Sequence, residues 1–205
     1  VHPSASLEIN FQRTLRIPDN DEDYGLPPGL GKFPLRHVDD FASALPPRWI
    51  EHGGVMLPMY QAEAMWIRFD AHYDDERKVD YPFAVRIAAG KINAVTGQQW
   101  TQGLHAKPQD YMTVPRQPWL DGFCVDKGTI RQFVAMPLGA GYSAEEQITG
   151  AAEHGGVQIE VYPMKREVFE RRFPKPRPRP RGVLYRSMEC YAPACESPAM
   201  GLAAG

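Results

Sequence analysis

The stretch from Trp119 to Met164 constrains the fold most, because its segments carry the local chemistry of defined conformations. Two apolar runs flank an Asp-Lys-Gly turn at residues 126–128. This arrangement predicts a β-hairpin in which Gly128 supplies the positive φ of a bulged turn. Apolar and polar residues then alternate over residues 157–162, the pattern of a half-buried strand. The centre of the chain is therefore expected to be antiparallel β structure.

The other strands are expected from the same period of two. The clearest runs from Leu7 to Ile17, where apolar residues alternate with polar ones and only Arg13 breaks the pattern. Further strands are expected at residues 55–60, 64–69, 83–88, 91–96, 111–114 and 183–190. The sequence predicts a mostly β fold (all-β or α+β), an antiparallel sandwich or distorted barrel with short peripheral helices.

Short helices are predicted between these strands. Ser143 and Glu146 have the spacing of a capping box, so a helix is expected over residues 144–149 and Gly150 is expected to end it. Further helices are expected at residues 37–45, 47–52 and 165–172, the last as a charged surface helix.

The domain organisation follows from composition along the chain. Residues 1–173 are expected to form a single β-rich domain, and residues 174–205 a proline/arginine-rich linker and tail. The motif FPKPRPRPR at residues 173–181 favours an extended polyproline II segment. Its basic side chains suit an acidic or SH3-like groove on a partner.

Charge and cysteine content exclude several classes of partner. The formal net charge of −2 gives no overall attraction to nucleic acid or to an anionic membrane, and neither is expected as a partner. No apolar run approaches the roughly 20 residues of a membrane helix. Three cysteines give no disulfide framework, which favours a reducing compartment and a cytoplasmic location.

No cofactor or metal is expected. Gly139-Ala140-Gly141 precedes a helix, but no lysine follows at the spacing of a phosphate-binding loop. Glu145 and Glu146 in the first helical turn would repel a phosphate. Cys190 and Cys195 lack the further ligands that a zinc site needs.

A repeated pentapeptide supplies the first candidate site. Residues 51–55 and 153–157 both read Glu-His-Gly-Gly-Val. Two related turn-and-strand units would place His52 and His154 at one end of a sheet, where both imidazoles could meet a ligand. The alternative is that each histidine bonds the last carbonyls of a helix, as a local feature of a turn.

A second candidate site lies on two strands that are expected to be neighbours. Arg131 and Gln132 face opposite sides of one strand, so one of them points inward and needs polar partners. Together with Glu160 and Tyr162 it would form the floor of a polar, ligand-binding pocket. The alternative is an exposed sheet face with cross-strand pairs.

Several longer motifs carry a resemblance. They are FPLRHVDDFA, GGVMLPMYQAEAMWI, YPFAVRIAAGKINAVTG, QPWLDGFCVDKGTIRQFVAMPLGAGYSAEEQITG and EHGGVQIEVYPMK. The chain resembles a family of uncharacterised bacterial and fungal proteins over most of residues 7–173. The resemblance implies one cooperative folding unit and carries over no catalytic residue.

Three classes of function follow from these features. The first is a binding or structural/assembly module with a small polar ligand, or a homo-oligomer or larger assembly. The second is a metal-independent enzyme acting on a small polar or carbohydrate-like substrate. The third is a proline-motif interaction protein. A concave site with His, Glu or Asp in hydrogen-bond reach would favour an enzyme, and a flat apolar surface would favour a module.

Overall fold

The computed structural model describes residues 1–18, 20, 22, 24–126 and 129–177. The strands are β1 (Leu7–Thr14), β2 (Arg36–His37), β3 (Val55–Met56), β4 (Ala64–Ala71), β5 (Tyr73–Asp74), β6 (Val79–Asp80), β7 (Phe83–Ala89), β8 (Ile92–Asn93), β9 (Met112–Val114), β10 (Trp119–Leu120), β11 (Gly122–Asp126), β12 (Thr129–Val134) and β13 (Val157–Pro163). The helices are the 3-10 turn η1 (Asp39–Phe41), α1 (Pro47–His52), α2 (Ala144–Thr149) and α3 (Arg166–Arg172). The mostly β fold with short helices is confirmed.

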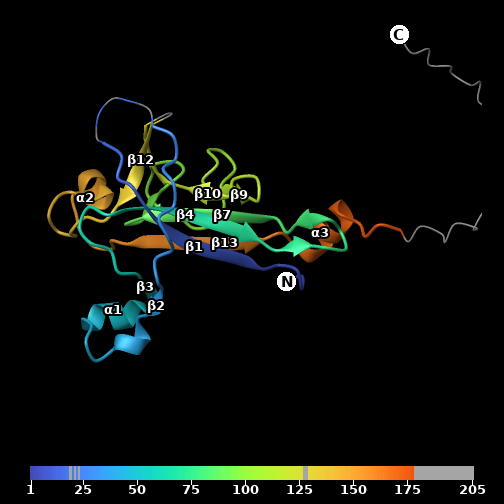
Figure 1. The fold of residues 1–205 in the computed structure, drawn as a ribbon, viewed down its shortest axis with the longest axis horizontal. Coiled ribbons are helices and arrows are strands. Elements are labelled where there is room, and N and C mark those ends of the chain that lie inside the picture. The colour runs from blue at the N-terminus through green and yellow to red at the C-terminus, as the bar shows by residue number, and fades with distance from the viewer. Residues whose placement is uncertain (19, 21, 23, 127–128, 178–205) are drawn as a thin grey trace, which may run out of the picture.

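Two antiparallel sheets form the body of the molecule (Figure 1). One has the order β1-β4-β12-β11, with β10 also paired to β4. The other has the order β13-β7-β8, with β9 also paired to β7. Within the described residues both orders are open paths, so the strands do not close into a barrel.

The two sheets share one apolar core. Alternate residues of β4 and β7 supply much of it, because successive side chains of a strand point to opposite faces. The residues that these two strands contribute to the core are Met65, Ile67, Phe69, Phe83, Val85 and Ile87. Phe11 of β1 and Phe133 of β12 complete the contact between the sheets. The side chains of β7 between Phe83, Val85 and Ile87 therefore point away from this core.

The predicted hairpin is confirmed as β11 and β12, and the register shifts between Cys124 and Asp126 as a bulge would produce. Gly128 lies outside the described residues. The capping box of α2 is also confirmed, since the Glu146 amide donates to the Ser143 hydroxyl at 3.2 Å. Gly150 ends the helix in the left-handed conformation, with φ at 75°.

A lobe made of β2, η1, α1 and β3 projects from the sheets (Figure 1). Only α1 matches its prediction here. Most of the predicted helix at residues 37–45 is replaced by β2 and one 3-10 turn, and the predicted strand at residues 55–60 ends at Met56. Pro58 has no amide proton to donate to a strand partner, which accounts for the early end.

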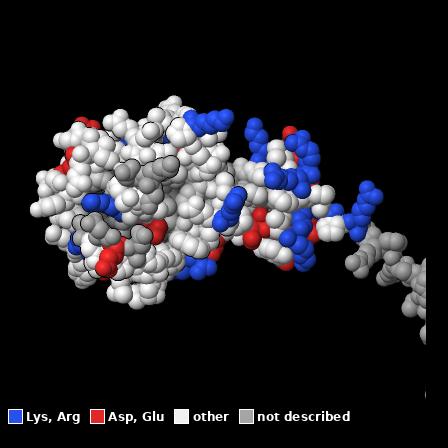
Figure 2. All heavy atoms as spheres, turned by 90° about the horizontal axis from the view of Figure 1, so that it is seen from above, with Lys and Arg blue, Asp and Glu red and all other residues white. Residues whose placement is uncertain are grey.

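Helix α3 closes one end of the molecule, and it is less exposed than predicted. Phe169 is fully buried, with its ring centroid 4.2 Å from that of Tyr81. Figure 2 shows basic and acidic side chains intermixed at the end of the molecule that carries α3. Arg166 pairs with Glu170 of the same helix at 2.9 Å. The helix therefore combines a buried aromatic anchor with a charged outer face.

Among the described residues, no helix has the length and apolarity required to span a membrane. The predicted strand at residues 183–190 and the tail beyond residue 177 lie outside the described residues, so the division of the chain at residue 174 stays a prediction.

Candidate functional site

The outer face of β7 carries a buried cation. Since Phe83, Val85 and Ile87 point into the core, Arg86 must lie on the opposite face. Residues 93–110 cover that face, and Arg86 is 0% exposed. A guanidinium taken out of water needs partners for its charge and for its donors.

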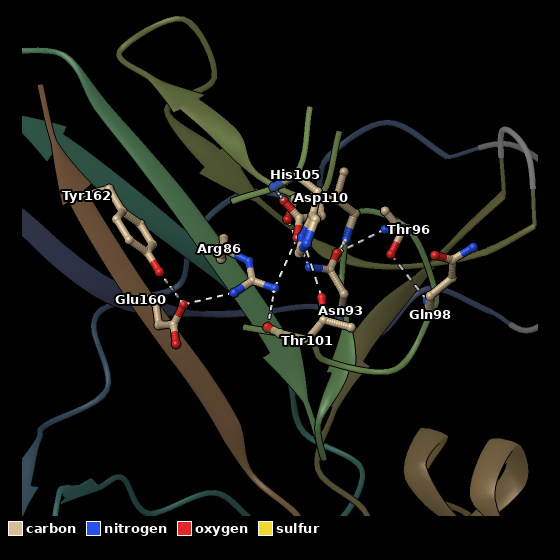
Figure 3. A network of polar contacts seen from close by, with 10 residues as sticks. Arg86, Asn93, Thr96, Gln98, Thr101, His105, Asp110, Glu160 and Tyr162 are labelled. Atoms are coloured by element: carbon tan, nitrogen blue, oxygen red, sulfur yellow. Dashed lines mark hydrogen bonds and ion pairs between the residues drawn. The ribbon is translucent and has the colours of Figure 1, made fainter. Parts of the chain in front are cut away.

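Arg86 has four such partners, of which Figure 3 labels Glu160, Thr101 and Asp110. Its Nη1 donates to Glu160 Oε2 at 2.9 Å, from the residue directly opposite on β13. Its Nη2 donates to the Thr101 carbonyl at 2.8 Å and lies 3.0 Å from Asp110 Oδ2. The guanidinium carbon also lies 4.0 Å from the centroid of the Trp100 ring, a cation–π contact. The arginine is thus fixed between β13 and the covering loop.

Asp110 is the second buried charge of the cluster. Its Oδ1 accepts the His105 amide at 2.8 Å, and its Oδ2 lies 2.9 Å from His105 Nδ1. Burial alone would raise the pKa of the Asp110 carboxyl, but the His105 hydrogen bonds and the Arg86 guanidinium hold that pKa below its ordinary value. Asp110 is therefore an ionised, acceptor-only group at neutral pH.

The ionisation of Asp110 sets the tautomer of His105. Because a carboxylate only accepts, His105 Nδ1 must donate to it. Nε2 is then the nitrogen left for another contact, and the side chain is 48% exposed. A carboxylate that orients a partly exposed imidazole in this way is the arrangement that general-base histidines use.

Asn93 holds the covering loop in place from the start of that loop. Its Nδ2 donates to the Asp110 carbonyl at 2.8 Å. Its Oδ1 accepts the amides of Val95 and Thr96 at 2.9 and 3.0 Å. Asn93 is 2% exposed, so it replaces the hydrogen bonds to water that these backbone groups lose. Asn93 thus satisfies three backbone groups of an irregular loop.

A pocket of about 180 Å³ lies over this cluster. Its lining is polar apart from one proline. The lining residues are Arg86, Asn93, Thr96, Gln98, Gln99, Thr101, His105, Lys107, Pro108 and Asp110. A wider hollow of about 480 Å³ is lined by Gln109, Thr113, Arg116 and Gln117. All four of those residues are exposed, and none of them is a buried charge, so the smaller pocket is the stronger candidate.

Two of the predicted site residues belong to this cluster. Glu160 binds Arg86, and the Tyr162 hydroxyl donates to Glu160 Oε2 at 2.9 Å. That hydrogen bond, together with burial, raises the pKa of Tyr162. Glu160 and Tyr162 therefore form one polar edge of the Arg86 network, outside the lining of the pocket.

Arg131 and Gln132 lie elsewhere, because β12 pairs with β4 and β11 whereas β13 pairs with β7. The expected neighbouring position of these strands is wrong. Gln132 instead fastens the chain after β1: its Nε2 donates to the Leu15 carbonyl and its Oε1 accepts the Ile17 amide, both at 2.9 Å. Arg131 is exposed.

The two repeated histidines are not brought into one cluster. His52 Nδ1 donates to the Arg48 carbonyl at 2.7 Å, the helix-terminal contact that was the alternative prediction. His154 is 44% exposed, and its side chain lies 3.9 Å from Glu153 of the same turn. β3 and β13, which follow the two copies, belong to different sheets.

Sequence reasoning missed Arg86, His105 and Asp110. The available signal was one arginine inside FAVRIAA, an otherwise apolar strand whose inner positions are all apolar. A charge at such a position requires a buried partner. His105 and Asp110 gave no comparable signal, because a histidine and an aspartate in a polar loop are ordinary.

Within the described part of the chain, no group of three or more His, Cys, Asp or Glu side chains is arranged to hold a metal ion. No protein-family model, curated protein or solved structure matches this chain.

Proposed function

We propose that the protein is a binding module for a small polar ligand, and that the pocket over Arg86 and Asp110 is its binding site. The observation that carries the proposal is a fully buried arginine beneath a hollow whose lining residues are polar apart from one proline. Buried ion pairs add little net stability compared with apolar packing. A concave site over buried charges, one of them a carboxyl with a lowered pKa, Asp110, is typical of functional sites.

The rigidity of the lining also supports binding. Asn93, Asp110 and Thr101 are already fixed by hydrogen bonds within the protein, so a ligand would not have to order them. Groups fixed in advance reduce the entropy that binding loses. The exposed ends of Gln98, Gln99 and Lys107 remain available for contacts with a ligand.

Titration of the full, ¹⁵N-labelled chain with a panel of small polyols, sugars and organic acids tests this proposal. We expect amide shifts confined to residues 93–110. Gln99→Trp, which fills the pocket, should abolish them. The matched control Gln117→Trp, in the wider hollow, should keep them. The absence of shifts from every compound, or shifts that survive Gln99→Trp, would remove the pocket as a ligand site.

The His105–Asp110 pair favours a second candidate function, a metal-independent enzyme acting on a small polar or carbohydrate-like substrate. The pair leaves His105 Nε2 available to take a proton from a substrate hydroxyl or from water. Turnover of nitrophenyl glycosides or esters should then survive EDTA. It should be lost in His105→Gln without a change in the circular dichroism spectrum. Activity that His105→Gln retains would exclude this mechanism.

The predicted homo-oligomer or larger assembly stays a prediction, as does the cytoplasmic location. The surface that would carry self-association is the projecting lobe, where Trp49, Ile50 and Val55 are 43%, 37% and 52% exposed. Light scattering after size exclusion of the full chain, compared with Trp49→Ser, tests it. A monomer at all concentrations would contradict the prediction.

A further inference from the structure

The neutral side chains around the pocket suit a ligand that carries hydroxyl groups. Thr96, Thr101, Gln98 and Gln99 each offer both a donor and an acceptor. Pro108 is the one apolar side chain in the lining. A hydroxyl group has the same dual character, whereas an apolar ligand would leave these groups unpaired and lose affinity.

The charged residues that line the pocket are two cations, Arg86 and Lys107, and one carboxylate, Asp110. Asp110 supplies the one negative charge of the lining, and its two oxygens are already engaged by Arg86 and His105. Lys107 is an exposed second cation, with no acidic partner among the described residues. Glu160, the other carboxylate of the cluster, is bound to Arg86 and Tyr162 outside the lining. Arg86 is therefore paired with two carboxylates, and Lys107 is the lining cation that no described carboxylate contacts.

The size of the pocket limits the ligand. A volume of about 180 Å³ corresponds to roughly six molecules of liquid water at about 30 Å³ each. It is smaller than the roughly 300–1,000 Å³ of pockets that enclose drug-sized molecules. A volume of this size fits a single sugar-sized molecule, with part of that molecule facing solvent.

We infer that the pocket binds a small polyhydroxylated anion, a sugar acid or a sugar phosphate, an inference that rests on the proposed binding function. Lys107 attracts the carboxylate or phosphate, as a compact cation does for either group. Hydroxyl groups pair with the threonine and glutamine side chains and donate to His105 Nε2. The anionic group and the hydroxyl groups are both required.

Calorimetric titration of the full chain tests this inference with gluconate, glucose 6-phosphate, glucose, acetate and inorganic phosphate as probes. A charge-assisted hydrogen bond is about twice as strong as a neutral one, so we expect at least one hydroxylated anion to bind about tenfold tighter than glucose. Acetate and inorganic phosphate should bind more weakly than both hydroxylated anions. Whether gluconate or glucose 6-phosphate binds more tightly distinguishes a carboxylate from a phosphate ligand.

Variants of Lys107 separate a direct contact from general electrostatic attraction. Lys107→Gln should lower the affinity for the hydroxylated anions to that for glucose, whereas Lys107→Arg should keep the preference for the anion. Lys32→Gln is the matched control, because Lys32 pairs with Glu8 of β1 and does not line the pocket. If Lys32→Gln reduced the preference for the anion as much as Lys107→Gln, the proposed contact with Lys107 would be wrong.

Other outcomes distinguish a failure of this inference from a failure of the proposed binding function. If glucose binds as tightly as gluconate and glucose 6-phosphate, the binding function stands and the anionic ligand is wrong. If acetate or phosphate binds as tightly as the hydroxylated anions, the requirement for hydroxyl groups is wrong. If none of the five probes binds, the inference fails, and the wider panel of polar compounds decides whether the binding function fails with it.

Discussion

The pentapeptide Glu-His-Gly-Gly-Val occurs twice in this chain, and its two copies have different structures. In the first copy, the glutamate and histidine form the last residues of α1. The Gly53 amide donates to the Trp49 carbonyl at 2.9 Å, and His52 bonds the Arg48 carbonyl. This copy is a helix terminus whose side-chain hydrogen bond is local, and the Val38 amide donates to its Gly54 carbonyl at 3.1 Å.

The second copy is a turn outside any helix. The amides of Glu153, His154 and Gly155 donate to the carboxylate of Glu145 at 3.1, 2.9 and 2.7 Å. Glu145 comes from α2 and is 3% exposed. The turn is therefore wrapped around a buried anion that the first copy lacks.

The valines that follow the two copies differ in the same way. Val55 is 52% exposed and begins a two-residue strand in the lobe. Val157 packs against the core and begins the seven-residue β13. The Gly90 amide, in the turn between β7 and β8, donates to the Gly156 carbonyl and ties this copy to the sheet. The same five residues thus adopt different structures because different parts of the chain pack around them.

Among the substitutions that test this comparison, removal of the Glu145 carboxylate should lower the unfolding free energy most. Glu145→Ala leaves three amides without their acceptor, and we expect unfolding free energy to fall by about 3 kcal/mol. Glu51→Ala, in the copy without such a contact, should change it by less than about 0.5 kcal/mol. Urea denaturation measures both. Equal effects would show that the Glu145 contacts do not distinguish the copies.

The stabilisation that the Glu145 carboxylate provides should also depend on pH. Burial alone would raise the pKa of Glu145, but the amides of Gly155, His154 and Glu153 hold that pKa below its ordinary value. Between the folded and unfolded pKa values, the unfolded state binds more protons, so stability falls as pH falls. The contribution is fully present above the unfolded pKa and is lost as pH falls through the folded pKa.

Denaturation of the wild-type chain and of Glu145→Gln at a series of pH values measures this. The stability difference between them should be constant from pH 7 to about pH 5 and shrink at lower pH. Because Asp74, Asp110 and Glu146 also have lowered pKa values, only this difference isolates Glu145. A difference that does not change with pH would contradict the assignment.

Glycine substitutions should destabilise the protein to a different extent in the two copies, and the difference should be smaller than for the glutamates. Gly53 and Gly155 both have φ near +60°, which disfavours any side chain. A Cβ at Gly155 would lie 3.0 Å from the Leu138 side chain, whereas a Cβ at Gly53 would have no described atom within 4 Å. We expect Gly53→Ala to cost about 1 kcal/mol and Gly155→Ala about 1.5 kcal/mol, measured as shifts in denaturation midpoint. A larger cost at Gly53 would reverse the predicted order.

Removal of each histidine should have the smallest effect. His52→Ala deletes one exposed helix-terminal hydrogen bond, and we expect a loss of about 0.5 kcal/mol. His154→Ala should be close to neutral, because the ion pair of its ring with Glu153 is exposed. Thermal melting of the two variants side by side measures this. A greater loss for His154→Ala would indicate a contact of its side chain beyond the turn.

Short-range chemistry by itself determined much of the β architecture. The alternation that begins at Leu7 gave β1, and the alternation from Val157 gave β13. Ser143 and Glu146 gave the start of α2, since a capping box needs only residues three apart. Each of these structures depends on residues that are close in the chain, so a single sequence contains the information.

Only the tertiary structure decided the candidate site and the fate of the repeated pentapeptide. Arg86 meets Glu160 across 74 residues, and the loop that buries both Arg86 and Asp110 has no periodic pattern. The second Glu-His-Gly-Gly copy differs from the first because the packing of α2 places a carboxylate beneath it. The free energy of a buried charge depends on which distant groups surround it, and that is fixed only when the sheets and loops pack together.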